Sequence, residues 1–540
     1  MEIIQTLMKN ILNRKNIFNT QSLTLLLIII AILFVANLIS ANHFGRLDLT
    51  ADKQYSISKT TKDTLKKLDD LLTIKVYFSQ TLPPDLAQTA QYIKDVLSEY
   101  KAYSPKVKVD FIDPAKDETN KSEVQSLGIP EVEMQVMEKD QFKVQKGYLG
   151  IAIFFGSKKE IIPIVQDVAN IEYELTSAIK RLTSENLKNI GFLTGHDEHN
   201  IYEIPSYANM QASTSDYTSI KKELDKNYNV TMVDISNGQK IENIDTLIVA
   251  GPKKAISDRE LYEIDQFLMR GGQAIFLADQ INISNNLQAE VNQTGLDKLL
   301  ANYGIQANSN LVMDVSNETV GFSSGYMQFF LPYPFWPKLI KDNFAKDNPI
   351  MARLQSVSLP WSSSVNSLDK EGVTTTILAT TTYSGSTVSQ PFNLDPQQQY
   401  NPSERKKVPM IILAKGKLNS AYAGQKAPEI SSGKSENVSA DKTIDKAENE
   451  IQIIAVGDSD FINDDNLKRF PDNAVFFQNA VDYLTMGSDL ISIRAKTLQD
   501  RPLNQPSESK KTWIKIINLI IIPLLVIAFG LFRFYQRKRK

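Results

Sequence analysis

Residues 246–278 read TLIVAGPKKAISDRELYEIDQFLMRGGQAIFLA, and this stretch decides the fold. Its two ends, Thr246–Ala250 and Ala274–Ala278, are short apolar runs that are typical of buried strands. Between them Ser257 is a favoured N-cap residue, and the helix that it opens runs to Arg270, where a Gly-Gly pair ends it. A strand, a helix and a second strand in this order favour parallel pairing through a right-handed crossover.

The same alternation extends to both sides of this unit. Upstream, we expect strands at Asn189–Leu193 and Val230–Asp234, with a helix at Tyr217–Lys226 between them. Far downstream, Ile451–Val456 predicts a last strand that returns to the same sheet and leads into a helix through Asn473–Leu484. Repeated units of this kind predict an α/β domain with a doubly wound parallel sheet.

This doubly wound domain, which we expect at residues 187–495, carries a β-rich insertion. The strands of the insertion are expected at Val373–Thr382 and Pro409–Lys417. Polar tracts at 384–407 and 419–449 are rich in Ser, Gln, Asn, Lys and Pro, a composition that predicts mobile loops.

Residues 45–185 predict a separate α/β domain at the N-terminal side. A polar linker is followed by a helix near Thr60–Leu71, and Asp85 is the expected cap of a later helix. The expected strand, helix and strand that follow lie at Thr73–Ser79, Pro84–Tyr103 and Val107–Ile112. Glu133–Lys143 and Tyr148–Phe155 then predict a hairpin around Lys146-Gly147. This order resembles a thioredoxin-like domain, but its redox CxxC motif is excluded because the chain has no cysteine.

Composition excludes several classes of function. The 540 residues exceed what one hydrophobic core organises, so the chain is multidomain. The formal charge of −2, from 60 Lys and Arg against 62 Asp and Glu, provides no overall field that attracts nucleic acid. The absence of cysteine removes disulfides, thiolate zinc sites and cysteine nucleophiles.

Two apolar segments predict membrane anchors, one near each end of the chain. Leu23–Ala41 contains no charged residue, and at about 1.5 Å per residue it crosses most of a hydrocarbon layer of about 30 Å. Ile516–Phe532 is the core of the second anchor. A cleaved signal peptide is the main alternative for the first segment, but the apolar run is longer than usual and Ile39 disrupts the small-residue cleavage pattern.

Basic residues flank both segments on the same side of the membrane. Lysines and arginines precede the first segment and follow the second: Lys9, Arg14, Lys15, Arg533, Arg537, Lys538, Arg539 and Lys540. The positive-inside rule then predicts a two-pass protein of the cytoplasmic membrane with both ends inside and the large middle region outside. The expected division is a tail at 1–22, a span at 23–41, a linker at 496–512, a span at 514–535 and a basic tail at 536–540. Tails this short hold no folded output domain, so any inward signal requires a membrane partner.

Carboxylates and histidines follow several strands of the doubly wound domain. His196 and Glu198 come after its first strand, Asp279 follows another strand, and Asp458 and Asp460 follow the last. In open α/β sheets the carboxyl ends of the strands border the ligand crevice, so these five are the candidate ligand-binding residues. The alternative, which the frequency of Asp in turns favours, is that they cap helices and satisfy turn backbones.

We expect no metal, no cofactor and no catalytic residue. His196 and His199 form an H-x-x-H pair, but they lie in a loop rather than on the rigid helix that zinc motifs use. Replacing both by Ala should therefore leave metal content and folding unchanged.

Three further motifs have weak support. Gly321–Gly325 fits the G-x-S-x-G pattern, but the prolines that follow forbid the helix that a nucleophile elbow requires. Gly433–Ser435 resembles the end of a phosphate-binding loop without its first glycine. The aromatic stretch Tyr326–Trp336 either packs a domain junction or offers a binding surface, and packing is favoured.

A family resemblance runs through nearly the whole chain. Its motifs are, in order, the RLDLTADKQYSIS segment at 46–58, Gly195–Glu198, Ala250–Pro252, Gly457–Phe461, Asn479–Asp482 and Ile491–Arg494, followed by the apolar helix with its basic tail. This series resembles the gliding-motility-type ABC transporter auxiliary components, the GldG-like family. Asp197, where that family often has Gly, and the polar insertion at 419–449 depart from the pattern.

The resemblance implies an accessory subunit, sometimes described as substrate-binding, that works with a separate ABC permease and ATPase. The first hypothesis is accordingly a non-enzymatic auxiliary protein whose outer region binds a ligand or envelope partner and whose helices contact the permease and membrane lipid. A membrane-anchored metal-dependent hydrolase and a purely structural envelope scaffold are the alternatives.

Overall fold

The computed structural model describes most of the chain in two units, Met1–Thr497 and Leu498–Lys540. The described residues are 25–35, 56–486 and 515–539, with gaps at 81, 139–140, 166–170, 185–186, 203–216, 237, 285, 325–326, 347, 352–353, 399, 401–403 and 430–441. Several predicted features lie outside them: the basic residues before the first apolar segment, residues 46–55, Gly433–Ser435, the linker at 496–512 and Ile491–Arg494.

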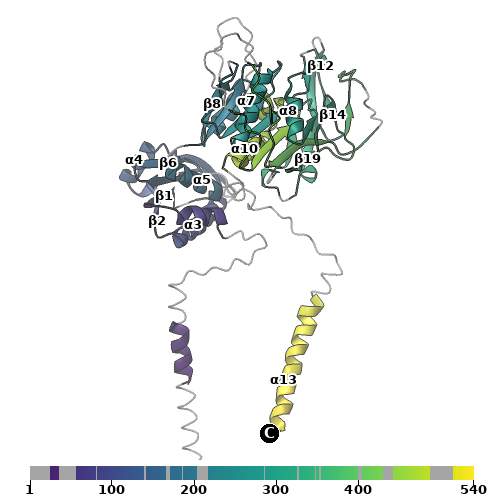
Figure 1. The fold of residues 1–540 in the computed structure, drawn as a ribbon. Coiled ribbons are helices and arrows are strands. Elements are labelled where there is room, and N and C mark those ends of the chain that lie inside the picture. Colours follow the sequence, from purple (N-terminus) through teal and green to yellow (C-terminus); the bar gives the residue numbers. More distant parts are fainter. Residues whose placement is uncertain are drawn as a thin grey trace, which may run out of the picture. The chain divides into compact units, whose positions relative to one another are not determined.

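The first domain contains a four-stranded sheet in the order β2-β1-β5-β6 (Figure 1). The strands are Leu72–Phe78 (β1), Val107–Ile112 (β2), Leu149–Phe155 (β5) and Lys158–Ile162 (β6). β1 pairs with β2 in parallel and with β5 antiparallel. The helices are Lys59–Lys66 (α2), Pro84–Tyr103 (α3), Glu118–Ser126 (α4) and Ile171–Thr183 (α5). Side chains from α2, α3 and α5 form one apolar core with the sheet, and α4 packs in a smaller cluster with Tyr77 and Ala152.

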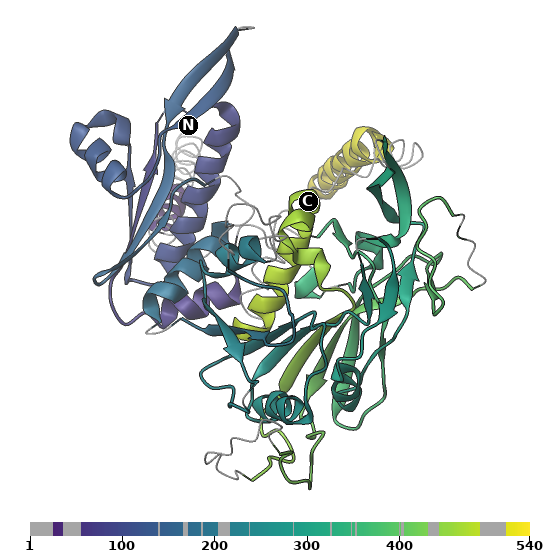
Figure 2. The same ribbon diagram turned by 90° about the horizontal axis from the view of Figure 1, so that it is seen from above.

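The β-α-β unit predicted in this domain is confirmed, but three local predictions are wrong. The first helix ends at Lys66, and Pro83 rather than Asp85 is the N-cap of α3. The hairpin joins Val132–Glu138 (β3) to Gln141–Gly147 (β4), while β5 belongs to the main sheet. The alternation of apolar and polar residues continues on both sides of Tyr148. The sequence pattern therefore does not reveal that β4 and β5 belong to different sheets. Figure 2 shows this hairpin extending away from the sheet.

The second domain contains a seven-stranded sheet in the order β19-β21-β22-β10-β9-β7-β8. Five strands run in parallel: Asn189–Thr194 (β7), Asn229–Asp234 (β8), Thr246–Ala250 (β9), Gln273–Leu277 (β10) and Ile451–Val456 (β22). Helices Asp258–Met269 (α7) and Leu296–Asn302 (α8) pack on one face of this sheet. Thr218–Leu224 (α6) and Asp472–Met486 (α10) pack on the other. The domain is therefore doubly wound, as expected.

The sheet is mixed rather than purely parallel, which corrects the predicted fold class. Val373–Thr380 (β19) and Pro409–Gly416 (β21), which the sequence predicts in the β-rich insertion, extend the main sheet as antiparallel strands beyond β22. Small two- and three-stranded sheets make up the rest of the insertion. The tract at 384–407, for which composition predicts a mobile loop, contains strand Ser386–Val388 (β20) and the buried Leu394. In the tract at 419–449, the described part packs through the buried Ser420 and Ala447.

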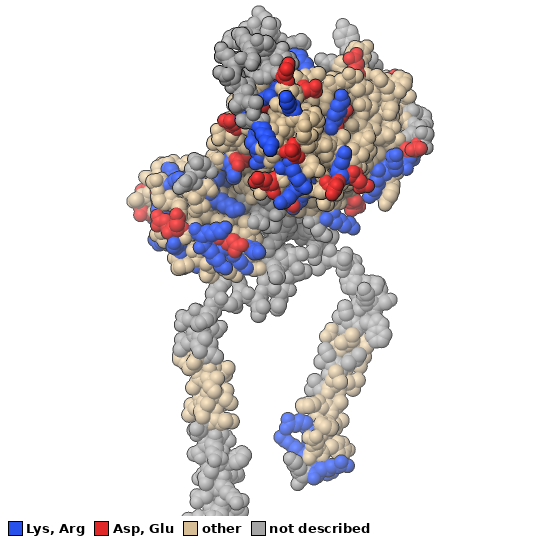
Figure 3. Space-filling view, viewed as in Figure 1, with Lys and Arg blue, Asp and Glu red and all other residues tan. Residues whose placement is uncertain are grey.

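The described part of the C-terminal unit is an apolar helix. A π-helical turn at Ile517–Ile521 precedes Pro523, which cannot donate a backbone hydrogen bond, and α13 continues as Ile522–Lys538. Together they form a segment of 22 residues that contains an 18-residue window with a mean hydropathy of 2.3, long and apolar enough to cross a membrane. Figure 3 shows lysine and arginine gathered at its end. Near the other terminus, the described apolar helix, Leu25–Val35, is shorter than a span.

Candidate functional site

The candidate residues follow the carboxyl ends of the parallel strands. His196 and Glu198 follow β7, Asp279 follows β10, and Asp458 and Asp460 follow β22. These strands are neighbours through β9 and β10, so their carboxyl ends lie at one edge of the sheet. The side chains nevertheless separate into two hydrogen-bonded clusters.

The first group, which we call the Ser459 cluster, consists of Ser459, Asp279, Asp460, His199 and Tyr217. The Ser459 backbone N–H donates to Asp279 Oδ1 at 2.7 Å, and its hydroxyl donates to Asp279 Oδ2. His199 Nε2 lies 3.0 Å from Ser459 Oγ and 3.5 Å from Asp460 Oδ1. The Tyr217 hydroxyl donates to the Ser459 carbonyl oxygen at 2.6 Å, and its ring stacks on His199 with centroids 4.6 Å apart. Ser459, which follows β22, thus connects to residues that follow β7 and β10.

Gly251, at the end of β9, makes this arrangement sterically feasible. Its φ of +60° lies in the left-handed region that favours glycine. A Cβ at this position would lie 2.2 Å from Ser459 Oγ and 2.8 Å from Asp279 Oδ2. Any side chain at residue 251 would therefore displace the serine from its carboxylate partner.

The hydrogen-bond directions argue against a serine nucleophile. Ser459 is fully buried, and its only hydroxyl proton is given to Asp279. The Oγ atom must then accept from His199, which places a proton on Nε2. An imidazole in this state cannot remove the serine proton, so the contact resembles a nucleophile–base pair only in distance.

Burial and mutual repulsion raise the pKa values of two carboxyls here. For Asp279, burial and then the charge of Asp460 raise the pKa from 3.8 to about 6. Burial, with Asp279 and Asp460 nearby, holds the pKa of Asp458 well above its ordinary value. Asp458 Oδ1 accepts the Asp460 N–H at 2.8 Å, whereas its buried Oδ2 has no hydrogen-bond partner among the described residues. The surroundings of Asp458 therefore disfavour its ionised form relative to a carboxyl in water.

The second group, which we call the His196 cluster, lies against the start of α7. Glu198 accepts the His196 N–H at 2.6 Å, and its other oxygen is 3.1 Å from His196 Nδ1. On the other side of the ring, Nε2 lies 3.3 Å from Glu260 Oε2. Glu260 is also the capping-box partner of Ser257. Burial lowers the pKa of His196, but the two glutamates outweigh it and raise the pKa above its ordinary value.

The structure thus brings Asp279, Asp458 and Asp460 together and places His196 and Glu198 in a different cluster. Within the described residues, no group of three His, Cys, Asp or Glu side chains is arranged to hold a metal ion. Both histidines are buried and hydrogen-bonded, so replacing them should reduce stability, contrary to the sequence-based expectation of unchanged folding.

Sequence reasoning missed four contributors: Ser459, Tyr217, Gly251 and Glu260. Two of them had a local signal, because the capping-box spacing marks Glu260 and the turn after a buried strand marks Gly251. Ser459 lies within the motif Gly457–Phe461, but nothing there indicates its partners. Tyr217 is an ordinary residue of a helix start, and only the tertiary fold gives it a role.

The remaining motifs have structural roles in the described chain. Gly321–Ser324 lie within strand Asn317–Ser324 (β15), which pairs with Met327–Ile340 (β16), so the strand–turn–helix of a nucleophile elbow is not formed there. Tyr333, Phe335 and Trp336 are buried in one apolar cluster, so this half of the aromatic stretch packs as predicted, whereas Phe330 is 65% exposed.

More than half of the chain matches a known protein family. Residues 187–485 match the family described as an "ABC-type uncharacterized transport system". The chain belongs to this family. Residues 51–154 match a domain of unknown function. An uncharacterized protein of Borreliella burgdorferi is 26% identical over 538 residues, which cover 96% of this chain and 98% of that protein.

Solved structures are only distantly similar to this member of the transport-system family. The N-terminal domain of mmIFT52 gives a TM-score of 0.33 at 14% identity, with 55% of this chain and 98% of that chain covered. PurLQS from Thermotoga maritima gives 0.24 at 11% identity, with 55% and 99% covered. Scores this low support no argument about fold or function.

Membership of the ABC-type family indicates an accessory, transport-associated protein rather than a catalyst. The candidate membrane helix at Ile517–Lys538 agrees with an association with a membrane. The gliding-motility subfamily is a finer assignment than this match provides.

Proposed function

We propose that this chain is a non-enzymatic accessory subunit of an ABC transporter complex of the gliding-motility type. In this proposal the two α/β domains lie outside the cytoplasm, where they bind a ligand or an envelope partner. The apolar segments near both ends cross the membrane and contact the permease, which works with a separate ATPase. The observation that carries the proposal is the family match over 187–485 in a chain that ends in an apolar helix.

The geometry of the Ser459 cluster supports a binding rather than a catalytic role. Its serine, Ser459, is buried. The hydrogen bonds of Ser459 require a proton on His199 Nε2, so this nitrogen is not free to accept the serine proton as a general base would. Asp460 is the exposed member of the cluster, with 41% of its side chain exposed, whereas Asp279 is half-buried. We assign ligand contact to Asp460, and to His196, Glu198, Asp279 and Asp458 the task of holding the loops that surround it.

The first domain supports a thioredoxin-like scaffold without redox chemistry. The order β2-β1-β5-β6, with one parallel pair followed by two antiparallel pairs, and helices on both faces, is the arrangement expected from that resemblance. Because the chain has no cysteine, we assign this domain to binding or to assembly.

Recovery of the complex tests the proposal. Full-length protein purified in mild detergent should bring a permease and an ATPase with it, because short tails leave the membrane as the route of contact. A chain that lacks residues 515–540 is the control, and it should recover less of both subunits. Repeated isolation of the full chain alone would count heavily against a transporter role and favour the structural scaffold.

Reporter fusions test the two-pass topology separately. A fusion after residue 300 should be active only with an extracytoplasmic enzyme, and a fusion after residue 540 only with a cytoplasmic one. This follows from the basic residues beyond both apolar segments. Activity of a cytoplasmic reporter at residue 300 would overturn the assignment.

A further inference from the structure

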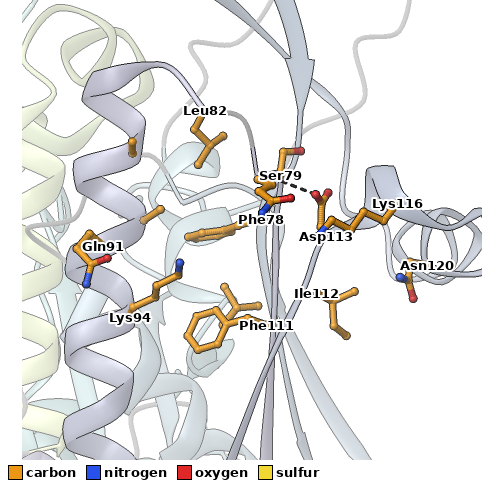
Figure 4. Close-up of a pocket in the computed structure, with 14 residues that line it drawn as sticks. Phe78, Ser79, Leu82, Gln91, Lys94, Phe111, Ile112, Asp113, Lys116 and Asn120 are labelled. Atoms are coloured by element: carbon orange, nitrogen blue, oxygen red, sulfur yellow. Dashed lines mark hydrogen bonds between the residues drawn. The ribbon is translucent and has the colours of Figure 1, made fainter.

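The first domain contains a cavity that none of the preceding assignments uses. Its volume is about 540 Å³, within the range typical of small-molecule sites. It lies beside the carboxyl ends of β1 and β2 and is bordered by α3 and by the start of α4 (Figure 4). Its position at the ends of two parallel strands is where ligands bind in open α/β sheets.

One side of the cavity is apolar. The lining includes Phe78, Leu82, Ala90 and Phe111. Phe78 is 8% exposed, whereas Phe111 is 47% exposed and presents a large apolar surface to solvent. Figure 4 shows the two rings near each other, between α3 and the strands. An apolar group placed against them would remove the Phe111 ring from water.

The charged lining residues leave an excess of positive charge. Lys94 and Lys116 both border the cavity, and neither makes an ion pair with any residue that the structure describes. Lys94 Nζ lies 5.7 Å from the centroid of the Phe111 ring, so its charge sits next to the apolar surface. The one carboxylate of the lining, Asp113, already accepts N–H groups from Gln80 at 3.2 Å and Ala115 at 3.0 Å.

We infer that this cavity binds an amphipathic anion, a carboxylate or phosphate attached to an apolar chain. The anionic group pairs with Lys94, and the apolar chain packs on Phe78, Leu82 and Phe111. Shared chemistry of this kind occurs in a single-chain lipid and in the free C-terminus of an apolar peptide. The inference does not depend on the transporter assignment, because binding here is measurable whether or not a permease accompanies the chain.

The absence of native cysteine allows a direct occupancy assay. Ala87→Cys places one thiol on the cavity lining, and Gln88→Cys places one on the same exposed turn of α3 outside the lining. Full-length protein in lipid nanodiscs is alkylated with a maleimide while the free concentration of each probe is varied. Octyl phosphate should slow the reaction of Ala87→Cys and leave Gln88→Cys unchanged. Octanol at the same free concentration and inorganic phosphate alone should protect at least about tenfold less, since each lacks half of the required chemistry.

The inference requires that the positive charge of Lys94 contributes to binding. Adding Lys94→Gln to Ala87→Cys should raise the octyl phosphate concentration needed for protection by about tenfold, the loss of one charge-assisted hydrogen bond. Lys101→Gln, which changes an exposed lysine of the same helix outside the lining, should have no effect. Thermal unfolding of each variant verifies that the domain is intact.

A second pair of probes identifies the source of the anion. An apolar hexapeptide with a free C-terminal carboxylate is compared with its C-terminal amide. Protection by the free acid supports a peptide terminus, and protection by octyl phosphate alone supports a lipid-type ligand. Equal protection by charged and neutral probes, or protection that Lys94→Gln leaves unchanged, would overturn the inference.

Discussion

Substituting Gly251 by Ala should destabilise the second domain by about 3 kcal/mol. The left-handed backbone, at φ +60°, costs an alanine about 1 kcal/mol relative to glycine. The new Cβ would also lie 2.2 Å from Ser459 Oγ, too close for the serine to keep its hydrogen bond to Asp279. Loss of a hydrogen bond to a charged group adds about 2 kcal/mol.

A matched glycine separates the two contributions. Gly424 has φ +71°, in the same domain, and a Cβ there would meet nothing within 4 Å. Gly424→Ala should therefore cost only the backbone contribution of about 1 kcal/mol. In urea unfolding followed by circular dichroism, the Gly251 variant should lose roughly three times as much stability as this control, from the two contributions combined. Equal losses would refute the claim that residue 251 must be glycine because of Ser459.

Three other predictions rest on the buried polar groups. Because the folded pKa of Asp279, at about 6, exceeds its ordinary value of 3.8, the folded state binds the proton more tightly. Stability relative to Asp279→Asn should then fall as pH rises through that window, which pH-dependent urea unfolding measures. Tyr173→Phe removes a hydroxyl that donates to the buried Asp482 carboxylate of α10 and should cost about 1–3 kcal/mol. Tyr103→Phe, whose hydroxyl has no hydrogen-bond partner among the residues that the structure describes, should be nearly neutral in the same assay. The double His196→Ala, His199→Ala change should lower the melting temperature without changing the metal content by elemental analysis, and stoichiometric zinc lost in the double variant would revive the hydrolase alternative.

Local patterns predicted the elements of the parallel sheet well. Between Thr246 and Leu277 the apolar runs and the Ser257 cap lie within a few residues of one another, so one window contains the information. The antiparallel strands were misassigned for the opposite reason. β21 pairs with β22, and nothing near Pro409 or Ile451 indicates which partner each strand chooses.

The candidate site was likewise predictable only in part from the sequence. Strand topology alone indicates that Asp279 and Asp460 approach one another, because both follow neighbouring parallel strands. The separation of His196 from them depends on Glu260, a residue of helix α7 that lies on the far side of the imidazole. Such competition between partners is a property of three-dimensional packing and has no counterpart in sequence spacing.

Strand β22 also sets the order in which the domain can be completed during synthesis. It lies inside the sheet, between β10 and β21, yet residues 278–450 separate it from β10 in the chain. A nascent chain that emerges from its N-terminus therefore exposes the edge of β10 until residues 451–456 arrive, and an exposed strand edge invites pairing with other chains. The edge stays open while residues 278–450 are synthesised, and a chain cut short before residue 451 has no strand to close it.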